Sequence, residues 1–136
     1  MSRLGMGVML QSLGGNKETV ETIKESLGKQ IKSIEIIEDG LNIQFDDKTG
    51  VRLFDDGQSC CEHRYMNSDD DLTYYKDSKL MDFELSDVIE EEKGDDVKES
   101  QFLKVKTNKG DFTIANYNEH NGYYGGFHIV ARKLYK

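Results

Sequence analysis

The sequence predicts an α+β domain in which one N-terminal amphipathic helix packs on an antiparallel β-meander sheet of about six to seven strands. Apolar residues recur at helical spacing near the N-terminus, and they alternate with polar residues along several later segments. No helical crossover separates these segments, so hairpins must connect them. The 136 residues are the usual length of one domain. We therefore expect a globular core over residues 16–134, preceded by a flexible or docking arm over residues 1–15.

The expected helix follows Asn16, whose side chain can cap the first turn, and it ends at Gly28. Val20, Ile23 and Leu27 lie on one face of this helix at helical spacing. This apolar face is expected to cover part of the sheet.

Period-two alternation and turn residues place the strands. Asp39–Gly40 between two alternating runs predicts a β-hairpin, and residues 46–50 predict a second turn. Residues 67–78 are typical of a surface loop or one helical turn, and the charge run 90–100 is typical of a solvated loop or hairpin tip. The expected strands cover residues 31–36, 41–45, 51–54, 81–85, 103–105, 112–114 and 127–131.

Charge and cysteine content limit the setting and the partners. The formal charge of −8 and the isoelectric point near 4.9 oppose binding to nucleic acid or to an anionic membrane, because such contacts depend on Lys and Arg. The two cysteines are neighbours, and a disulfide between neighbours is strained, which indicates a reducing cytoplasm. No apolar run reaches the roughly 18 residues of a membrane span. We expect a cytoplasmic protein with a basic target or a small ligand, and no cofactor.

Residues 54–65 concentrate the chemically active side chains and include both cysteines. On a strand, successive side chains face opposite sides, so Cys60 would share one face with Glu62. Cys61 and His63 would then share the opposite face. This alternation separates side chains that are neighbours in the sequence.

Three interpretations of this segment remain open. Cys61 and His63 have the residue types of a thiol nucleophile and its base, although residues two apart on a strand do not hydrogen-bond by default. Asp55, Cys61 and His63 are candidate metal ligands, but their spacing fits neither a structural zinc site nor a calcium loop. In the third interpretation, Asp55, Asp56 and Gly57 form a turn and one of the cysteines is buried in the core.

A second candidate site lies in residues 116–128, which we expect to form a loop rich in aromatic and amide side chains. Rings can stack on a flat ligand while amides bind its edges, which suits a nucleobase or a protein partner. The same composition also fits a hairpin loop that packs on its own sheet. Together with two arginines that can bind phosphate, the candidate binding residues are Tyr117, His120, Asn121, Tyr123, Tyr124, Phe127, His128, Arg64 and Arg132.

Residues 56–62, Asp-Gly-Gln-Ser-Cys-Cys-Glu, precede an acidic patch and a later Gly-Tyr-Tyr segment. In these features the chain resembles a family of small uncharacterised proteins from bacteria and their phages, over roughly residues 31–134. The shared motif corresponds here to Gln58, Cys60, Cys61 and Glu62, while His63 is not part of it. The resemblance implies a compact α+β domain in a phage or prophage setting, and no established activity.

The leading hypothesis is a non-enzymatic binding protein, a phage or prophage accessory factor that counters host defence in the bacterial cytoplasm. It would bind a host defence protein or sequester a small nucleotide-type signal. One alternative is a metal- or thiol-dependent enzyme centred on residues 60–63, and another is a structural phage component. The N-terminal arm favours a homo-oligomer. Negative net charge opposes nucleotide binding unless basic side chains gather locally, among them Arg52, Arg64, Lys104, Lys106 and Arg132.

Overall fold

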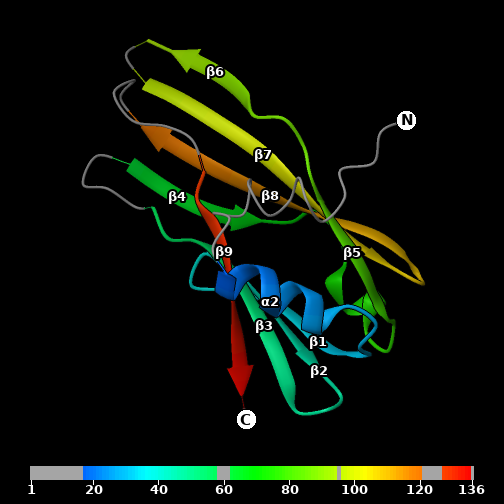
Figure 1. The fold of residues 1–136 in the computed structure, drawn as a ribbon. Coiled ribbons are helices and arrows are strands. Elements are labelled where there is room, and N and C mark those ends of the chain that lie inside the picture. The colour runs from blue at the N-terminus through cyan, green and yellow to red at the C-terminus, as the bar shows by residue number, and fades with distance from the viewer. Residues whose placement is uncertain (1–16, 58–61, 95, 121–126, 136) are drawn as a thin grey trace.

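The computed structural model describes residues 17–57, 62–94, 96–120 and 127–135, which form two antiparallel sheets and two helices (Figure 1). The first sheet has the strand order β1-β2-β3-β9, and the second has the order β4-β8-β7-β5, with β6 paired to β7. The elements are α2 (Lys17–Ser26), β1 (Ile31–Ile37), β2 (Gly40–Phe45), β3 (Thr49–Asp55), β4 (Glu62–Asn67), the 3₁₀ helix η1 (Leu72–Tyr75), β5 (Leu80–Leu85), β6 (Ile89–Lys93), β7 (Asp96–Thr107), β8 (Gly110–His120) and β9 (Ile129–Tyr135).

The α+β class is confirmed in broad terms, but the predicted strand number and the single sheet are wrong. The described chain contains nine strands in two sheets. The 3₁₀ helix η1 agrees with the helical turn expected within residues 67–78. The expected arm over residues 1–15 lies outside the described residues.

The helix α2 ends close to the predicted position. Gly28 has a φ of +86°, a left-handed conformation in which glycine has no Cβ to clash. The cap expected at Asn16 lies outside the described residues. Ile23 is fully buried, and Val20 and Leu27 are half-buried, as the helical spacing predicts. No helix in the described residues is long and apolar enough to cross a membrane.

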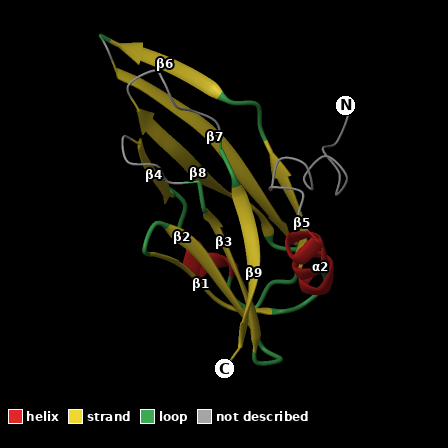
Figure 2. Ribbon diagram, turned by 60° about the vertical axis from the view of Figure 1, so that its left-hand side comes forward, coloured by secondary structure: helices red, strands yellow, loops and turns green. Residues whose placement is uncertain are grey.

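The helix packs on the first sheet beside β9 and β3 (Figure 1, Figure 2). β9 is the edge strand of that sheet. The hydroxyl of Thr19 accepts a hydrogen bond of 3.2 Å from the backbone N–H of Ala131 on β9. A backbone donor at the sheet edge therefore has a partner on the helix.

The predicted β1–β2 hairpin is confirmed, with its turn one residue earlier than expected. Glu38 and Asp39 have φ values of +50° and +63°, and positive φ at both central residues is typical of a type I′ turn. Gly40 already belongs to β2. A Cβ atom on Gly40 would lie 2.6 Å from Nη2 of Arg52, so a larger residue here would displace the guanidinium group that lies across this position.

Apolar side chains from both sheets and from α2 form one core cluster. The sheets also join at one corner, where the backbone N–H of Ile31 donates to the carbonyl of Ser78 and that of Leu80 donates to the carbonyl of Lys29. The largest fully buried side chains are Phe45, Phe83, Phe112, Ile23, Ile31, Leu41, Ile43, Leu53, Leu80 and Leu85.

The second sheet extends well beyond the apolar core. The described residues of the charge run 90–100 pair as strands β6 and β7. β7 and β8 are much longer than the strands predicted at 103–105 and 112–114. The buried side chains of these extensions are polar, so the apolar alternation that marks a half-buried strand is missing. They are Glu99, Gln101, Asn116, Asn118 and His120.

The apolar core can be tested on β5, where Phe83 is fully buried and Met81 is 53% exposed. Phe83→Ala is expected to lower the free energy of unfolding by about 3–5 kcal/mol, because it removes buried contacts and leaves a cavity. Met81→Ala is the matched control and should change it by less than about 0.5 kcal/mol. Urea unfolding measures both, and equal losses would contradict the different burial of these two side chains.

Candidate functional site

A buried cluster of charged and amide side chains joins the two sheets. We call Asp55, Glu62, Arg64 and Asn118 the polar cluster. Nη1 of Arg64 donates to both carboxylate oxygens of Asp55, at 2.9 and 2.8 Å, and Nη2 donates to Glu62 at 2.7 Å. The amide of Asn118 also donates to Glu62, at 2.9 Å. Because Asp55 ends β3 and the other residues lie on β4 and β8, the cluster connects the first sheet to the second.

The polar cluster is almost completely shielded from solvent. The side chains of Arg64, Asp55 and Glu62 are 7%, 8% and 1% exposed. Burial alone lowers the pKa of the Arg64 guanidinium, but the hydrogen bonds and charges of Glu62 and Asp55 outweigh burial and raise this pKa overall. The guanidinium therefore stays charged between two carboxylates, and removing it would leave both of them without their cation.

The turn after β3 is shaped around this arginine. The carboxylate of Asp55 accepts a hydrogen bond of 2.9 Å from the backbone N–H of Gly57. A Cβ atom on Gly57 would lie 3.0 Å from Nη1 of Arg64. The Asp55 side chain thus bonds the backbone two residues further on, a contact typical of a turn, in agreement with the turn expected at residues 55–57.

More polar side chains continue along the same buried face of the second sheet. Nε2 of His120 lies 2.9 Å from a carboxylate oxygen of Glu99. The amide of Asn116 donates to the backbone carbonyl of Gln101, and the amide of Gln101 donates to the carbonyl of Ser86, both at 3.0 Å. The space between the sheets therefore changes from apolar at one end to polar at the other.

The opposite face of the same strands carries three rings in a row, each tilted against the next. His63 and Tyr65 have ring centres 4.6 Å apart, and Tyr65 and Tyr117 have centres 5.0 Å apart. Nζ of Lys98 lies 4.5 Å from the centre of the Tyr117 ring, a cation–π distance. We call His63, Tyr65 and Tyr117 the aromatic strip. It spans β4 and β8, because Tyr65 and Tyr117 are paired directly across these strands.

The hydroxyl of Tyr65 donates a hydrogen bond to Glu119. Burial of the phenol raises the pKa of Tyr65 to about 12, with further contributions from this hydrogen bond and from the negative charge of Glu119. The Tyr65 ring is thereby held neutral and in place on the sheet.

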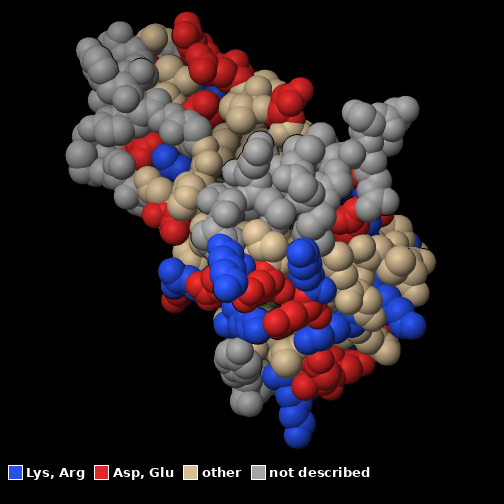
Figure 3. Space-filling model, in the orientation of Figure 1, with Lys and Arg blue, Asp and Glu red and all other residues tan. Residues whose placement is uncertain are grey.

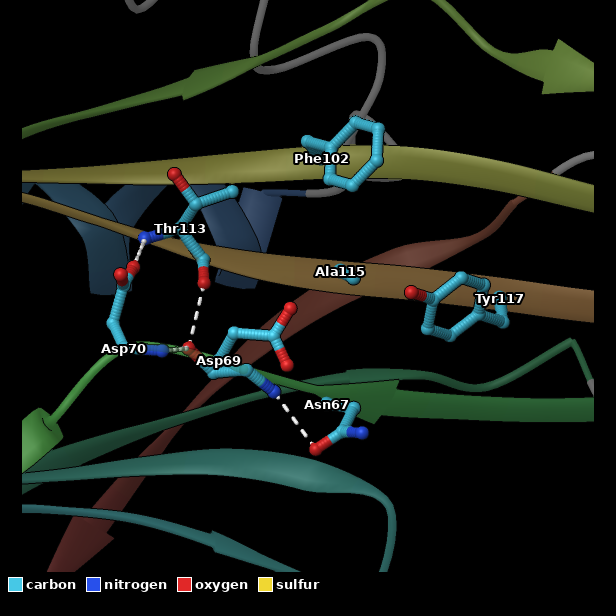
Figure 4. Close-up of a pocket in the computed structure, with 8 residues that line it drawn as sticks. Asn67, Asp69, Asp70, Phe102, Thr113, Ala115 and Tyr117 are labelled. Atoms are coloured by element: carbon cyan, nitrogen blue, oxygen red, sulfur yellow. Dashed lines mark hydrogen bonds between the residues drawn. The ribbon is translucent and has the colours of Figure 1, made fainter.

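A hollow of about 240 Å³ adjoins the aromatic strip (Figure 4). Ala115 lies between the rings of Phe102 and Tyr117, and the Tyr117 hydroxyl points toward the space over Ala115. The carboxylate of Asp69 enters the same space from the loop that follows β4. The full lining is Asn67, Ser68, Asp69, Asp70, Phe102, Thr113, Ala115 and Tyr117.

The loop beside the hollow takes over the pairing of β8 where β4 ends. Asn67 and Ala115 are the last pair between these strands. Beyond them, the backbone N–H of Thr113 donates to the carboxylate of Asp70 at 2.7 Å, and the hydroxyl of Ser68 donates to the carbonyl of Thr113 at 2.8 Å. Asp70 therefore serves the fold, whereas Asp69 presents its carboxylate to the hollow.

The predicted binding residues do not form one group. Residues 116–120 belong to strand β8, so the loop predicted for residues 116–128 is wrong there. Tyr117 lies on the outer face of β8, and His120 lies on its buried face. Arg64 belongs to the polar cluster, and Arg132 lies on β9 of the other sheet. Phe127 is half-buried against the core, and the exposed His128 pairs with Asp56. Outside the described residues lie Gln58, Cys60, Cys61, Asn121, Tyr123 and Tyr124.

The weak metal candidates are also separated. Asp55 points between the sheets, whereas His63 is exposed on the outer face of β4. Cys61 lies outside the described residues. Among the residues that the structure describes, no three His, Cys, Asp or Glu side chains come together as a metal site would require.

Sequence reasoning missed Tyr65, Phe102, Ala115 and Asp69. Tyr65, Phe102 and Ala115 lie on the outer face of β4, β7 and β8, which can be recognised only once the strand register is known. Asp69 lies in the loop after β4 and reaches the same face. A usable signal was the alternation within residues 62–67, where a charged residue alternates with an aromatic or imidazole ring over the first four positions.

A second hollow of about 390 Å³ lies at the end of β7 and β8, lined by Asp96, Val97, Lys98, Glu119 and His120. Residues 95 and 121–126 adjoin this lining in the sequence and lie outside the described chain. We therefore assign no ligand to it.

Comparison with known proteins gives one match. Residues 24–130 match the family model described as a domain of unknown function, DUF7448. No curated protein and no solved structure matches the chain. The matched region runs from the end of α2 into β9 and includes both the polar cluster and the aromatic strip.

The raised pKa of Tyr65 predicts a pH effect on stability. In the unfolded chain this phenol loses its proton near pH 10, whereas in the folded protein it keeps it to about pH 12. The folded state binds more protons than the unfolded state in this window. The contribution of Tyr65 to the free energy of unfolding therefore falls as the pH rises from 10 to 12. Tyr65→Phe removes this pH-dependent contribution. Urea unfolding across the window should show a shallower decline for Tyr65→Phe than for wild type, and parallel declines would contradict the assignment.

Proposed function

We propose that this chain, which belongs to the DUF7448 family of domains of unknown function, is a non-enzymatic binding protein. Its partner would be a host protein. The chain would be encoded by a phage or prophage and would act as a counter-defence factor. The resemblance of residues 56–62 to small phage and bacterial proteins supports the setting. The hollow beside the aromatic strip supports the binding role.

The size of the hollow favours a single side chain as its occupant. Pockets for small-molecule ligands usually measure about 300–1,000 Å³, whereas this hollow measures about 240 Å³. Partly exposed aromatic rings on a sheet face are common where two proteins meet, because they bury large areas with little loss of conformational freedom. A protein that inserts one side chain here and covers the strip fits better than a nucleotide.

The chemistry of the hollow favours a basic side chain. The rings of Phe102 and Tyr117 and the carboxylate of Asp69 can each attract an ammonium or guanidinium group. The net charge of −8 would steer a basic protein toward the chain. Acidic side chains also gather over β6, at the top of the view in Figure 3, where Glu90, Glu91 and Glu92 are exposed. Lysine or arginine on a basic host surface is therefore the proposed contact.

The described part of residues 54–65 supports this binding role over the enzyme alternative. Asp55, Glu62 and Arg64 are bound to one another between the sheets. Side chains held in this way serve the fold, and they are not presented to a substrate.

Affinity capture with matched variants tests the binding role. Wild-type protein on a resin should retain a host protein from a bacterial lysate, and Tyr74→Ala should retain it equally, because Tyr74 is 61% exposed outside the strip. Ala115→Leu fills the hollow and Tyr117→Ala removes one wall. Each should weaken the affinity for the retained protein about thirtyfold, as expected for a central interface contact of about 2 kcal/mol. Retention by all four proteins with equal affinity would contradict the proposal.

A further inference from the structure

Two arginines face each other on the outer side of the first sheet. Arg52 on β3 is paired directly with Arg132 on β9. Like charges directly opposite each other destabilise an antiparallel pair. In a chain with 26 acidic and 18 basic residues, carboxylates outnumber cations, so the pairing of two cations needs an explanation.

Neither arginine forms an ion pair with a described residue. Arg52 donates only to uncharged acceptors: the carbonyls of Ile37 and Glu38, at 3.0 and 3.1 Å, and the side-chain oxygen of Asn42, at 2.8 Å. Arg132 is exposed and makes no hydrogen bond within the described chain. In contrast, ion pairs do form at Lys17, Lys29, Arg64, Lys106 and Lys133.

The described carboxylates close to this pair form no ion pair with it. Glu38 contributes only its backbone carbonyl to Arg52. Glu35 lies in the same cross-strand row, but Asn42 stands between it and Arg52. Asp56, the residue that follows β3, pairs with His128. Within the described residues, therefore, no carboxylate neutralises the two arginines.

Phe54 holds both guanidinium groups on the outer face. The guanidinium carbons of Arg52 and Arg132 lie 5.5 and 5.2 Å from the centre of its ring. Gly40 leaves room for Arg52, since a Cβ atom there would lie 2.6 Å from Nη2. The two cations are thus positioned before any ligand arrives, which reduces the entropy lost on binding.

We propose that Arg52, Phe54 and Arg132 form a binding site for the phosphate groups of a small ligand. A guanidinium group presents a planar fork of donors that matches phosphate oxygens in a bidentate way, and all five N–H donors of Arg132 are free of hydrogen bonds within the described chain. Two cations on one ring match the multiple charges of a phosphate chain. This site lies on the first sheet, so it is separate from the hollow and does not depend on the proposed protein partner.

Isothermal calorimetry at low ionic strength, where screening is weak, tests this site. The probes are inorganic pyrophosphate, ADP and adenosine. Pyrophosphate and ADP, which carry two phosphate groups each, are expected to bind, and adenosine is not. ADP that binds tighter than pyrophosphate identifies a nucleotide as the source of the phosphate groups, and ADP that binds no tighter identifies the phosphate groups alone.

The most informative variant is Arg132→Gln, because the Arg132 side chain holds no other described element in place. It should weaken pyrophosphate binding by about tenfold or more, and it should abolish the rise in melting temperature that pyrophosphate gives to wild type. Lys104→Gln, on the exposed side of β7, removes one positive charge elsewhere and should leave both measurements unchanged. Absence of pyrophosphate binding in wild type, or equal binding by Arg132→Gln, would overturn the proposal.

Discussion

The structure depends on one buried cation that two carboxylates must share. Arg64 on β4 binds Asp55 at the end of β3 and Glu62 on its own strand, so it fixes the point where the chain passes from the first sheet to the second. A buried ion pair contributes little net stability, because desolvation offsets most of the attraction. Its effect is on geometry. Only an arrangement that brings both carboxylates to the guanidinium avoids leaving a buried charge unpaired.

This constraint also sets the surface that we propose for binding. Side chains alternate along β4, so turning Arg64 inward turns Tyr65 outward, next to Tyr117 on β8. A register shift of one residue would expose the arginine and bury the ring. The polar cluster and the aromatic strip thus lie on opposite faces of the paired strands β4 and β8. The hollow at Ala115 lies where that pairing ends.

Local patterns in the sequence were sufficient for the features that depend on neighbours in the chain. The helix ending at Gly28 and the β1–β2 hairpin follow from turn chemistry and spacing. The outer halves of β7 and β8 could not be found in this way, because Gln101 and Asn118 occupy buried positions where an apolar residue is the usual signal. The candidate sites could not be predicted from local patterns either. Spacing along the sequence cannot show that Tyr65 meets Tyr117, or that Arg52 meets Arg132, because each contact joins two strands.

A double-mutant cycle between Asp55 and Arg64 tests most directly whether the shared cation organises the fold. The free energies of unfolding of Asp55→Asn, Arg64→Met and the double variant are compared with that of wild type. Arg64→Met alone should cost about 3–5 kcal/mol, since it leaves two buried carboxylates without their cation. The double variant should lose at least about 1 kcal/mol less than the two single losses together, because one of those carboxylates is gone. Additive losses would show that the two side chains act independently and would contradict this account.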